Sequence, residues 1–118
     1  KEIFWQRRGS IMRAILINPE NKTVKEVDYD GDYKSIYKLI GCSTFDIVRI
    51  PVGFDGIYID DEGLYAKDQT FWSYRYNGTH APIKLVNKGL VLGCDDEGDS
   101  VAPDSTVEDI KKSIVWRW

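Results

Sequence analysis

The amino-acid sequence predicts an α+β fold, in which two helices pack on a mixed or antiparallel sheet. Short apolar runs bounded by proline, asparagine and glycine recur along the chain, as in strands joined by turns. Two other segments space their apolar residues three and four apart, as in amphipathic helices. The chain has 118 residues, which fits one compact domain. We expect residues 12–118 to form that domain and residues 1–11 to be an N-terminal arm or a remnant of expression.

The first expected elements are two strands, residues 12–18 and 23–29. Proline and asparagine in Pro19-Glu20-Asn21-Lys22 favour a turn between them, so the two strands predict a β-hairpin. Residues 14–17 are continuously apolar, which is typical of a strand covered on both faces.

A helix is expected directly after this hairpin. Asp32 can accept the free amide hydrogens of the first helical turn. The apolar residues after it recur at helical spacing, and Gly41 is typical of a helix C-terminus. The apolar stripe consists of Tyr33, Ile36, Tyr37 and Ile40.

Further strands are expected through the middle of the chain. Asp61-Glu62-Gly63 and Asn77-Gly78 are turn sequences, and the second is typical of a tight hairpin. The expected strands are residues 45–50, 56–60, 63–66, 71–76, 82–86 and 89–93.

The chain is expected to close on a second helix. Ser105 and Glu108 match a capping box, and Val107, Ile110 and Ile114 form an apolar stripe. We expect this helix to continue to the terminal tryptophans.

Composition excludes several classes of protein. The net charge of −3 argues against direct nucleic-acid binding, which usually needs a basic face. Residues 1–13 carry +3, so the rest of the chain carries −6. Two cysteines without CxxC spacing predict reduced thiols rather than a disulfide scaffold. No signal peptide or apolar span of membrane length is present, so we expect a cytoplasmic protein without membrane contact.

The segment 71–76 carries the first candidate site. Trp72, Tyr74, Arg75 and Tyr76 combine ring faces with a cation, which suits stacking of a nucleotide-like ligand or contact with a protein. Strand alternation places the tryptophan and both tyrosines on one face. The alternative is that these three rings cover the core.

Two acidic turns carry the second candidate site. Asp95, Asp96, Glu97 and Asp99 form a surface for contact with a protein, and they resemble the turn at residues 60–63. Such turns could bind a hard cation, but the EF-hand spacing is absent. The alternative is two solvated hairpin turns. We expect no metal and no cofactor.

Nucleophilic catalysis has little support. His80 is the only histidine, and a Cys–His pair would require contact within about 3 Å with one of the two cysteines. The sequence brings none of them together, so no catalytic residue is predicted.

Three segments in order resemble a small family of domains of unknown function, over about residues 12–115. They are residues 12–29, residues 32–42 and residues 89–100. The resemblance implies a setting in bacteriophages, prophages, plasmids and mostly Gram-positive hosts, but no site residues.

These observations predict a non-enzymatic accessory protein of phages or mobile elements that binds a host protein, as an antagonist of host defence. Two alternatives remain: a protein that binds a nucleotide-like small molecule, and a metal-dependent hydrolase that uses the acidic turns.

Overall fold

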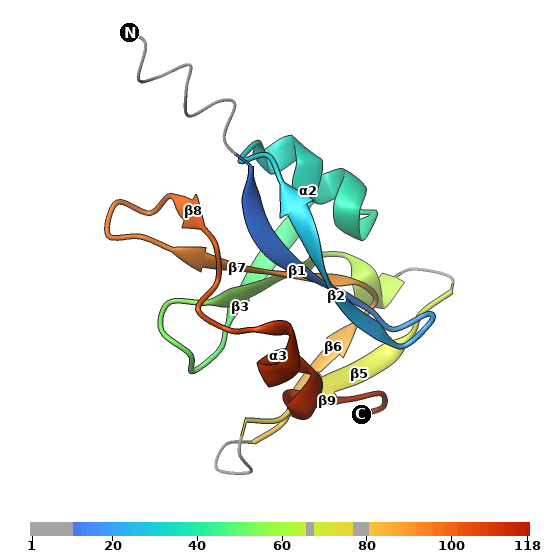
Figure 1. Ribbon diagram of the computed structural model, residues 1–118. Helices are drawn as coiled ribbons and strands as arrows, with labels where there is room; N and C mark the ends of the chain where they lie inside the picture. The colour runs from blue at the N-terminus through green and yellow to red at the C-terminus, as the bar shows by residue number, and fades with distance from the viewer. Residues whose placement is uncertain (1–10, 66–67, 77–80) are drawn as a thin grey trace, which may run out of the picture.

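A computed structural model describes residues 11–65, 68–76 and 81–118 (Figure 1). Two α-helices and antiparallel sheets make up this part of the chain, which confirms the predicted α+β class. The elements are β1 (Met12–Asn18), β2 (Thr23–Tyr29), α2 (Tyr33–Ile40), β3 (Phe45–Arg49), β4 (Gly56–Asp60), the 3-10 helix η1 (Gly63–Tyr65), β5 (Phe71–Tyr74), β6 (Ile83–Val86), β7 (Gly89–Cys94), β8 (Ser100–Val101), α3 (Val107–Ser113) and β9 (Ile114–Val115).

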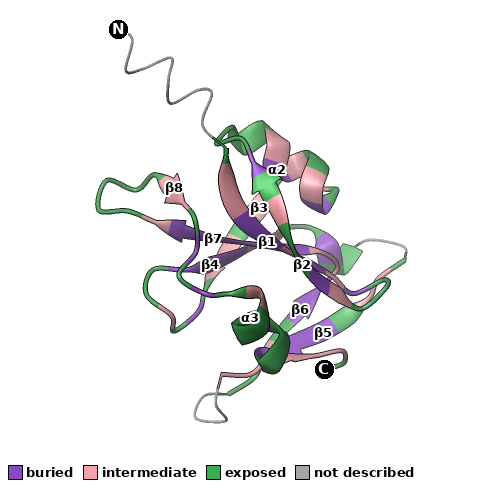
Figure 2. Ribbon diagram, viewed as in Figure 1, coloured by how far each residue is buried: buried purple, intermediate pink, exposed green. Residues whose placement is uncertain are grey.

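The larger sheet has the strand order β2-β1-β7-β4-β3, and β8 pairs with the end of β7. All of these pairs are antiparallel. The predicted hairpin of β1 and β2 is confirmed, with Met12 opposite Tyr29 and Asn18 opposite Thr23. Strand β7 lies at the centre and is buried except for Cys94, as expected for a strand flanked and covered on all sides (Figure 2).

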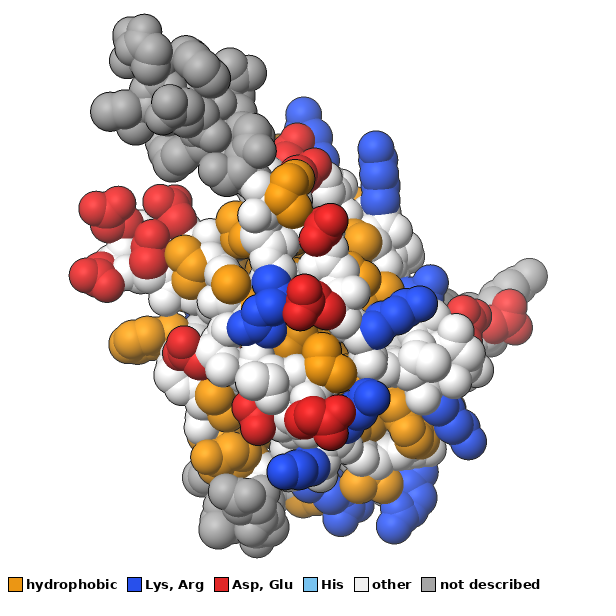
Figure 3. Space-filling view, viewed as in Figure 1, with side chains coloured by type: hydrophobic (Ala, Val, Ile, Leu, Met, Phe, Trp, Pro, Cys, Tyr) orange, Lys and Arg blue, Asp and Glu red, His pale blue; other side chains and the backbone are white. Residues whose placement is uncertain are grey.

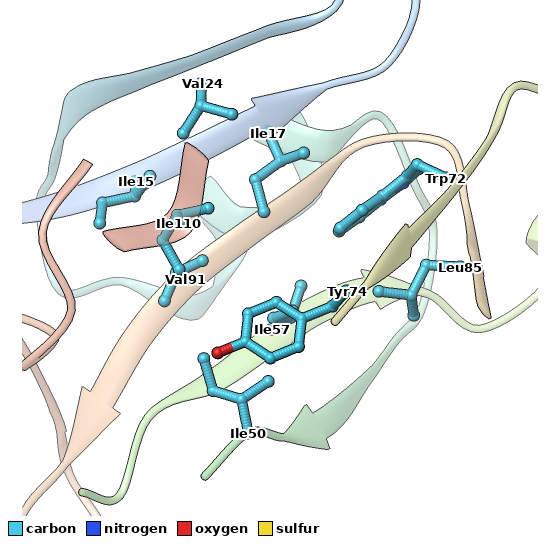
Figure 4. Close-up of a cluster of buried hydrophobic side chains, with 10 residues drawn as sticks. All are labelled: Ile15, Ile17, Val24, Ile50, Ile57, Trp72, Tyr74, Leu85, Val91 and Ile110. Carbon is cyan, nitrogen blue, oxygen red and sulfur yellow. The ribbon is translucent and has the colours of Figure 1, made fainter. Parts of the chain in front are cut away.

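The two faces of this sheet are covered by different elements. Helix α2 packs on one face, and its Ile36 and Ile40 join a buried cluster with Ala14. The other face is covered by α3 and by a smaller sheet of order β6-β5-β9. Figure 4 shows this second cluster, in which Ile15 of β1 lies beside Ile110 of α3 and Ile17 lies toward Trp72 of β5. Strand β1 therefore contributes to both clusters, as its continuous apolar run predicts.

Helix α2 begins and ends as predicted. The Asp32 carboxylate accepts a hydrogen bond from the Lys34 amide at 3.0 Å. Gly41 ends the helix with φ of 69°, a backbone conformation that glycine adopts without steric cost.

Two predicted strands are corrected. The strand predicted over residues 63–66 is absent at residues 63–65, because these form the 3-10 turn Gly63–Tyr65, and residue 66 lies outside the described residues. Strand β5 ends at Tyr74 rather than at residue 76, because the Arg75 amide donates instead to the Ser113 carbonyl at 2.7 Å. The predicted Asn77-Gly78 turn and His80 lie outside the described residues. The predicted arm, residues 1–11, is described only at Ile11.

The cap of the second helix is shifted by one residue from the prediction. Thr106 and Asp109 form the capping box, not Ser105 and Glu108. The physical reason is that the Ser105 hydroxyl is buried and donates to the Asp55 carboxylate at 2.7 Å. It is therefore not available to cap the helix.

The prediction that the second helix continues to the terminal tryptophans is wrong, because α3 stops at Ser113. Ile114 and Val115 form β9, which pairs with Tyr74 and Ser73 at the edge of β5. The β-branched side chains favour a strand, and the edge offers unpaired backbone groups. Residues 116–118 follow β9 without regular secondary structure, with a bend at Trp116. Within the described residues, no helix has the length and apolar character needed to cross a membrane.

Candidate functional site

The rings of β5 predicted to stack a ligand lie in the core. Trp72 is fully buried, and its indole N–H donates to the Asn87 carbonyl at 2.7 Å. Tyr74 is 2 % exposed and points into the same cluster (Figure 4). The alternation predicted from the sequence holds, but the sheet packing turns this face inward. The hypothesis that Trp72 and Tyr74 stack a ligand is therefore corrected, because both rings are covered by the core.

The remaining two candidates of this segment are half-buried. Tyr76 packs against the buried cluster. Arg75 follows β5, and its backbone is hydrogen-bonded to the end of α3. The four predicted ligand-binding residues consequently do not form one exposed surface.

The acidic turn between β7 and β8 is exposed, and acidic side chains gather at this edge of the molecule, at the left in Figure 3. One Asp95 oxygen accepts from the Glu97 and Asp99 amides, both at 2.9 Å, so this carboxylate orders the turn. Carboxylate oxygens of these three residues lie within 4.8 Å of one another, and three such oxygens can contribute to a cation site. Asp96 is exposed beside them. Contact of this turn with a protein remains a prediction.

One buried carboxylate performs a structural role. Asp55 is fully buried and accepts from the Asp104 amide at 2.8 Å and from the Ser105 amide and hydroxyl at 2.8 and 2.7 Å. The Arg13 guanidinium donates to the Pro103 and Ser105 carbonyls of the same segment. This arrangement holds the segment that leads into α3, and its acceptor is not open to solvent.

The Cys42 thiol is a poor nucleophile. Burial, together with the negative charge of Asp60, raises its pKa to about 11. Since the thiolate is the reactive form, this side chain is largely unreactive at neutral pH.

Two partly exposed rings, Phe71 and Trp118, meet instead at the C-terminal tail. Phe71 is 42 % exposed and Trp118 is 45 % exposed. Their ring centroids lie 4.8 Å apart in an edge-to-face arrangement, which is a favourable geometry for aromatic pairs. Both rings line a hollow of about 450 Å³, which we call the aromatic groove. Its lining residues are Pro19, Lys22, Thr70, Phe71, Trp116, Arg117 and Trp118.

Several contacts fix the tail that forms one wall of this groove. The Ser73 hydroxyl donates to the Arg117 carbonyl at 2.8 Å. The Trp118 indole N–H donates to the Leu85 carbonyl at 2.8 Å. The Lys84 ammonium lies 5.8 Å from the centre of the Trp118 ring, within the range of a cation–π contact. The exposed indole is thus held in one orientation, which lowers the entropy lost when a partner binds it.

A second hollow of about 190 Å³ shares Trp118 with the aromatic groove, since this residue lines both. We call it the acidic hollow, because three aspartates contribute to its lining. Leu64, which is 64 % exposed, adds an apolar side chain. The lining residues are Asp46, Ile59, Asp60, Asp61, Gly63, Leu64, Lys84, Leu85, Val86 and Trp118.

Sequence reasoning missed this surface because it placed the terminal tryptophans on a helix. The two β-branched residues Ile114 and Val115, directly before the tryptophans, were the signal that could have indicated a strand in place of the end of the helix.

A family model described as a domain of unknown function, DUF3846, matches residues 12–114. The chain belongs to this family. The matched range contains β1 through the first residue of β9, so the DUF3846 domain covers both sheets and both helices of the described chain. Three groove residues, Trp116, Arg117 and Trp118, follow the matched range. No curated protein sequence and no solved structure matches the chain.

Proposed function

We propose that this DUF3846 protein is a non-enzymatic accessory protein that binds a protein of its bacterial host, in the setting of phages and other mobile elements. Antagonism of host defence is the role that this setting suggests. The aromatic groove is the observation that supports binding, since two partly exposed rings meet there in a fixed geometry.

The composition of the groove favours a protein partner. Tryptophan, phenylalanine and arginine are enriched at protein interfaces, and fixed aromatic side chains provide much of their binding free energy. Phe71, Trp118 and Arg117 supply these three types side by side. The two hollows that share Trp118 extend the surface beyond what one ring would offer.

The placement of reactive groups supports binding rather than catalysis. The Asp55 carboxylate is occupied by three hydrogen bonds, and the raised pKa of Cys42 disfavours the thiolate. Neither side chain is among the described residues that line the aromatic groove, which include no cysteine and no carboxylate.

Affinity capture from lysate of a Gram-positive bacterium tests the proposal, at low and high salt. The test compares the wild-type protein with Phe71→Ser and with a matched control, Phe54→Ser. Phe54 is 73 % exposed and lies in the loop between β3 and β4, away from the groove lining. We expect wild type and F54S to retain the same partner and F71S to lose it. Equal capture by all three proteins, or capture by none at either salt concentration, would contradict the proposal.

The second candidate function is binding of a nucleotide-like small molecule. A hollow of about 450 Å³ is within the usual size of ligand pockets, and Lys22 and Arg117 could contact a phosphate. A thermal-shift panel of nucleotides tests it, because a ligand at 100 times its Kd adds about 2.7 kcal/mol to stability. Unchanged melting across the panel would exclude this candidate.

A further inference from the structure

The two hollows that meet at Trp118 differ in charge. The aromatic groove is lined by the cations Lys22 and Arg117, and its described lining residues include no aspartate or glutamate. The acidic hollow is lined by Asp46, Asp60 and Asp61, with Lys84 as its cation. The described lining therefore carries positive charge in the aromatic groove and mainly negative charge in the acidic hollow, and Trp118 belongs to both.

Both hollows also offer apolar contact. Phe71 and Trp116 line the aromatic groove, and Ile59 and Leu64 line the acidic hollow. Trp118 lines both hollows and is 45 % exposed, so an extended segment that packs on this ring could contact both. Opposite charges at the two ends of such a segment would fix its direction, because the reversed orientation places like charges together.

We propose that the partner presents a charge-polarised peptide segment to this surface. Its acidic end lies at Lys22 and Arg117, its basic end lies at the aspartates of the acidic hollow, and an apolar side chain packs beside Trp118. This inference rests on the proposed function and specifies the chemistry of the partner at the same site.

The charge pattern favours a peptide over a nucleic acid. A single strand needs a continuous cationic track for its phosphates, and the three aspartates beyond Trp118 repel that charge. A single nucleotide would fill only the aromatic groove and would leave the acidic hollow unused. A peptide can carry both signs of charge within a few residues.

The probe is a displayed library of random 12-residue peptides, selected on the wild-type protein. Enriched peptides are then measured against four variants, and against a fifth that combines the two charge-reversal pairs. Lys22→Glu with Arg117→Glu reverses the charge of the aromatic groove. Asp46→Lys with Asp61→Lys reverses the charge of the acidic hollow. Asp60 is left unchanged because its carboxylate accepts from the Glu62 amide at 2.9 Å and orders the turn.

The remaining two variants are controls for the surface and for charge. F71S removes an exposed ring of the groove. Lys25→Glu with Glu26→Lys changes exposed charges that line neither hollow.

We expect enriched peptides with acidic residues at one end, basic residues at the other and an apolar residue between. Each charge-reversal pair should weaken their binding at least tenfold, and the charge control should leave it unchanged. A peptide with its charged ends exchanged should bind the variant carrying all four reversals better than it binds wild type.

Other results overturn the inference. Peptides that lose binding to F71S but tolerate both reversals would refute the charge polarity and leave the proposed function intact. Peptides that bind F71S as well as wild type would contradict both the charge polarity and the proposed function. No enrichment overturns the peptide assignment, as does displacement of the peptides by ATP or by an oligothymidylate. A wild-type dimer that K22E/R117E dissolves would instead assign the surface to a second copy.

Discussion

Replacing Asp55 with alanine removes the acceptor that holds the segment leading into α3. The carboxylate is fully buried and accepts three hydrogen bonds, from the Asp104 amide and from the amide and hydroxyl of Ser105. Alanine would leave all three donors without this partner. Because this segment connects the larger sheet to α3, the loss acts on the packing of the helix as well as on the hydrogen bonds.

The magnitude follows from the three bonds. A hydrogen bond to a charged group contributes about 1.5 kcal/mol or more, so the three together contribute about 4–5 kcal/mol. Relief of the desolvation cost of a buried carboxylate offsets part of this. We expect Asp55→Ala to lower the free energy of unfolding by about 3 kcal/mol, which corresponds to about 12 °C in Tm for a domain of this size.

Urea unfolding followed by circular dichroism measures this change, with Asp96→Ala as an exposed control. Two further variants should follow a fixed order. Asp55→Asn keeps one acceptor oxygen but directs an NH₂ group at a donor, so its loss should be intermediate. Ser105→Ala removes one bond and should cost about 1 kcal/mol. A D55A protein within about 1 kcal/mol of the D96A control would refute the structural role given to this carboxylate.

Three other changes test separate parts of the fold. Gly89→Ala should destabilise by about 1–3 kcal/mol in thermal unfolding, because its Cβ would lie 2.8 Å from the Ile57 Cγ2; a neutral effect would contradict this packing. In a Cys94→Ser background at pH 8, iodoacetamide should alkylate Cys42 about 100-fold more slowly in the native state than in urea, since its pKa is raised from 9.0 to about 11; equal rates would contradict burial of the thiol. Thr106→Ala should cost about 1 kcal/mol in urea unfolding, because it removes the N-cap of α3; no loss would contradict the assigned cap.

The contribution of the Asp109 carboxylate in this capping box to the stability of the fold should depend on pH. Hydrogen bonds from Thr106 lower the pKa of this carboxyl below its ordinary value of 3.8. A lowered folded-state pKa stabilises the fold above the unfolded-state value, and this contribution is lost as pH falls through the folded-state value. The difference in stability between wild type and Asp109→Asn should therefore shrink in acid. A difference that stays constant down to the acid transition would contradict this hydrogen bond.

Local signals determine the parts of the fold that the sequence predicts well. The turn after Asn18 and the cap at Asp32 act over a few residues, so the β1–β2 hairpin and α2 follow from neighbouring side chains. The continuous apolar run of β1 likewise predicts its cover on both faces.

Contacts between residues distant in the sequence explain why the other sequence-based predictions were wrong. Ser105 is a reasonable cap by its local sequence, but Asp55, fifty positions away, takes its hydroxyl. The alternation of β5 is correct, yet only the packing of two sheets decides that Trp72 and Tyr74 face inward. Trp118 is placed by the Leu85 carbonyl, thirty-three residues earlier, and no neighbouring residue indicates that bond.

The indole N–H signals of the tryptophans test the central claim most directly. A ¹⁵N-labelled protein is titrated with the captured partner or with an enriched peptide. We predict that the Trp116 and Trp118 signals shift, because these residues line the aromatic groove. The Trp72 signal should stay in place, because that ring is buried and bonded to Asn87. Binding that leaves the Trp116 and Trp118 signals unchanged would contradict the assignment of the aromatic groove as the contact surface.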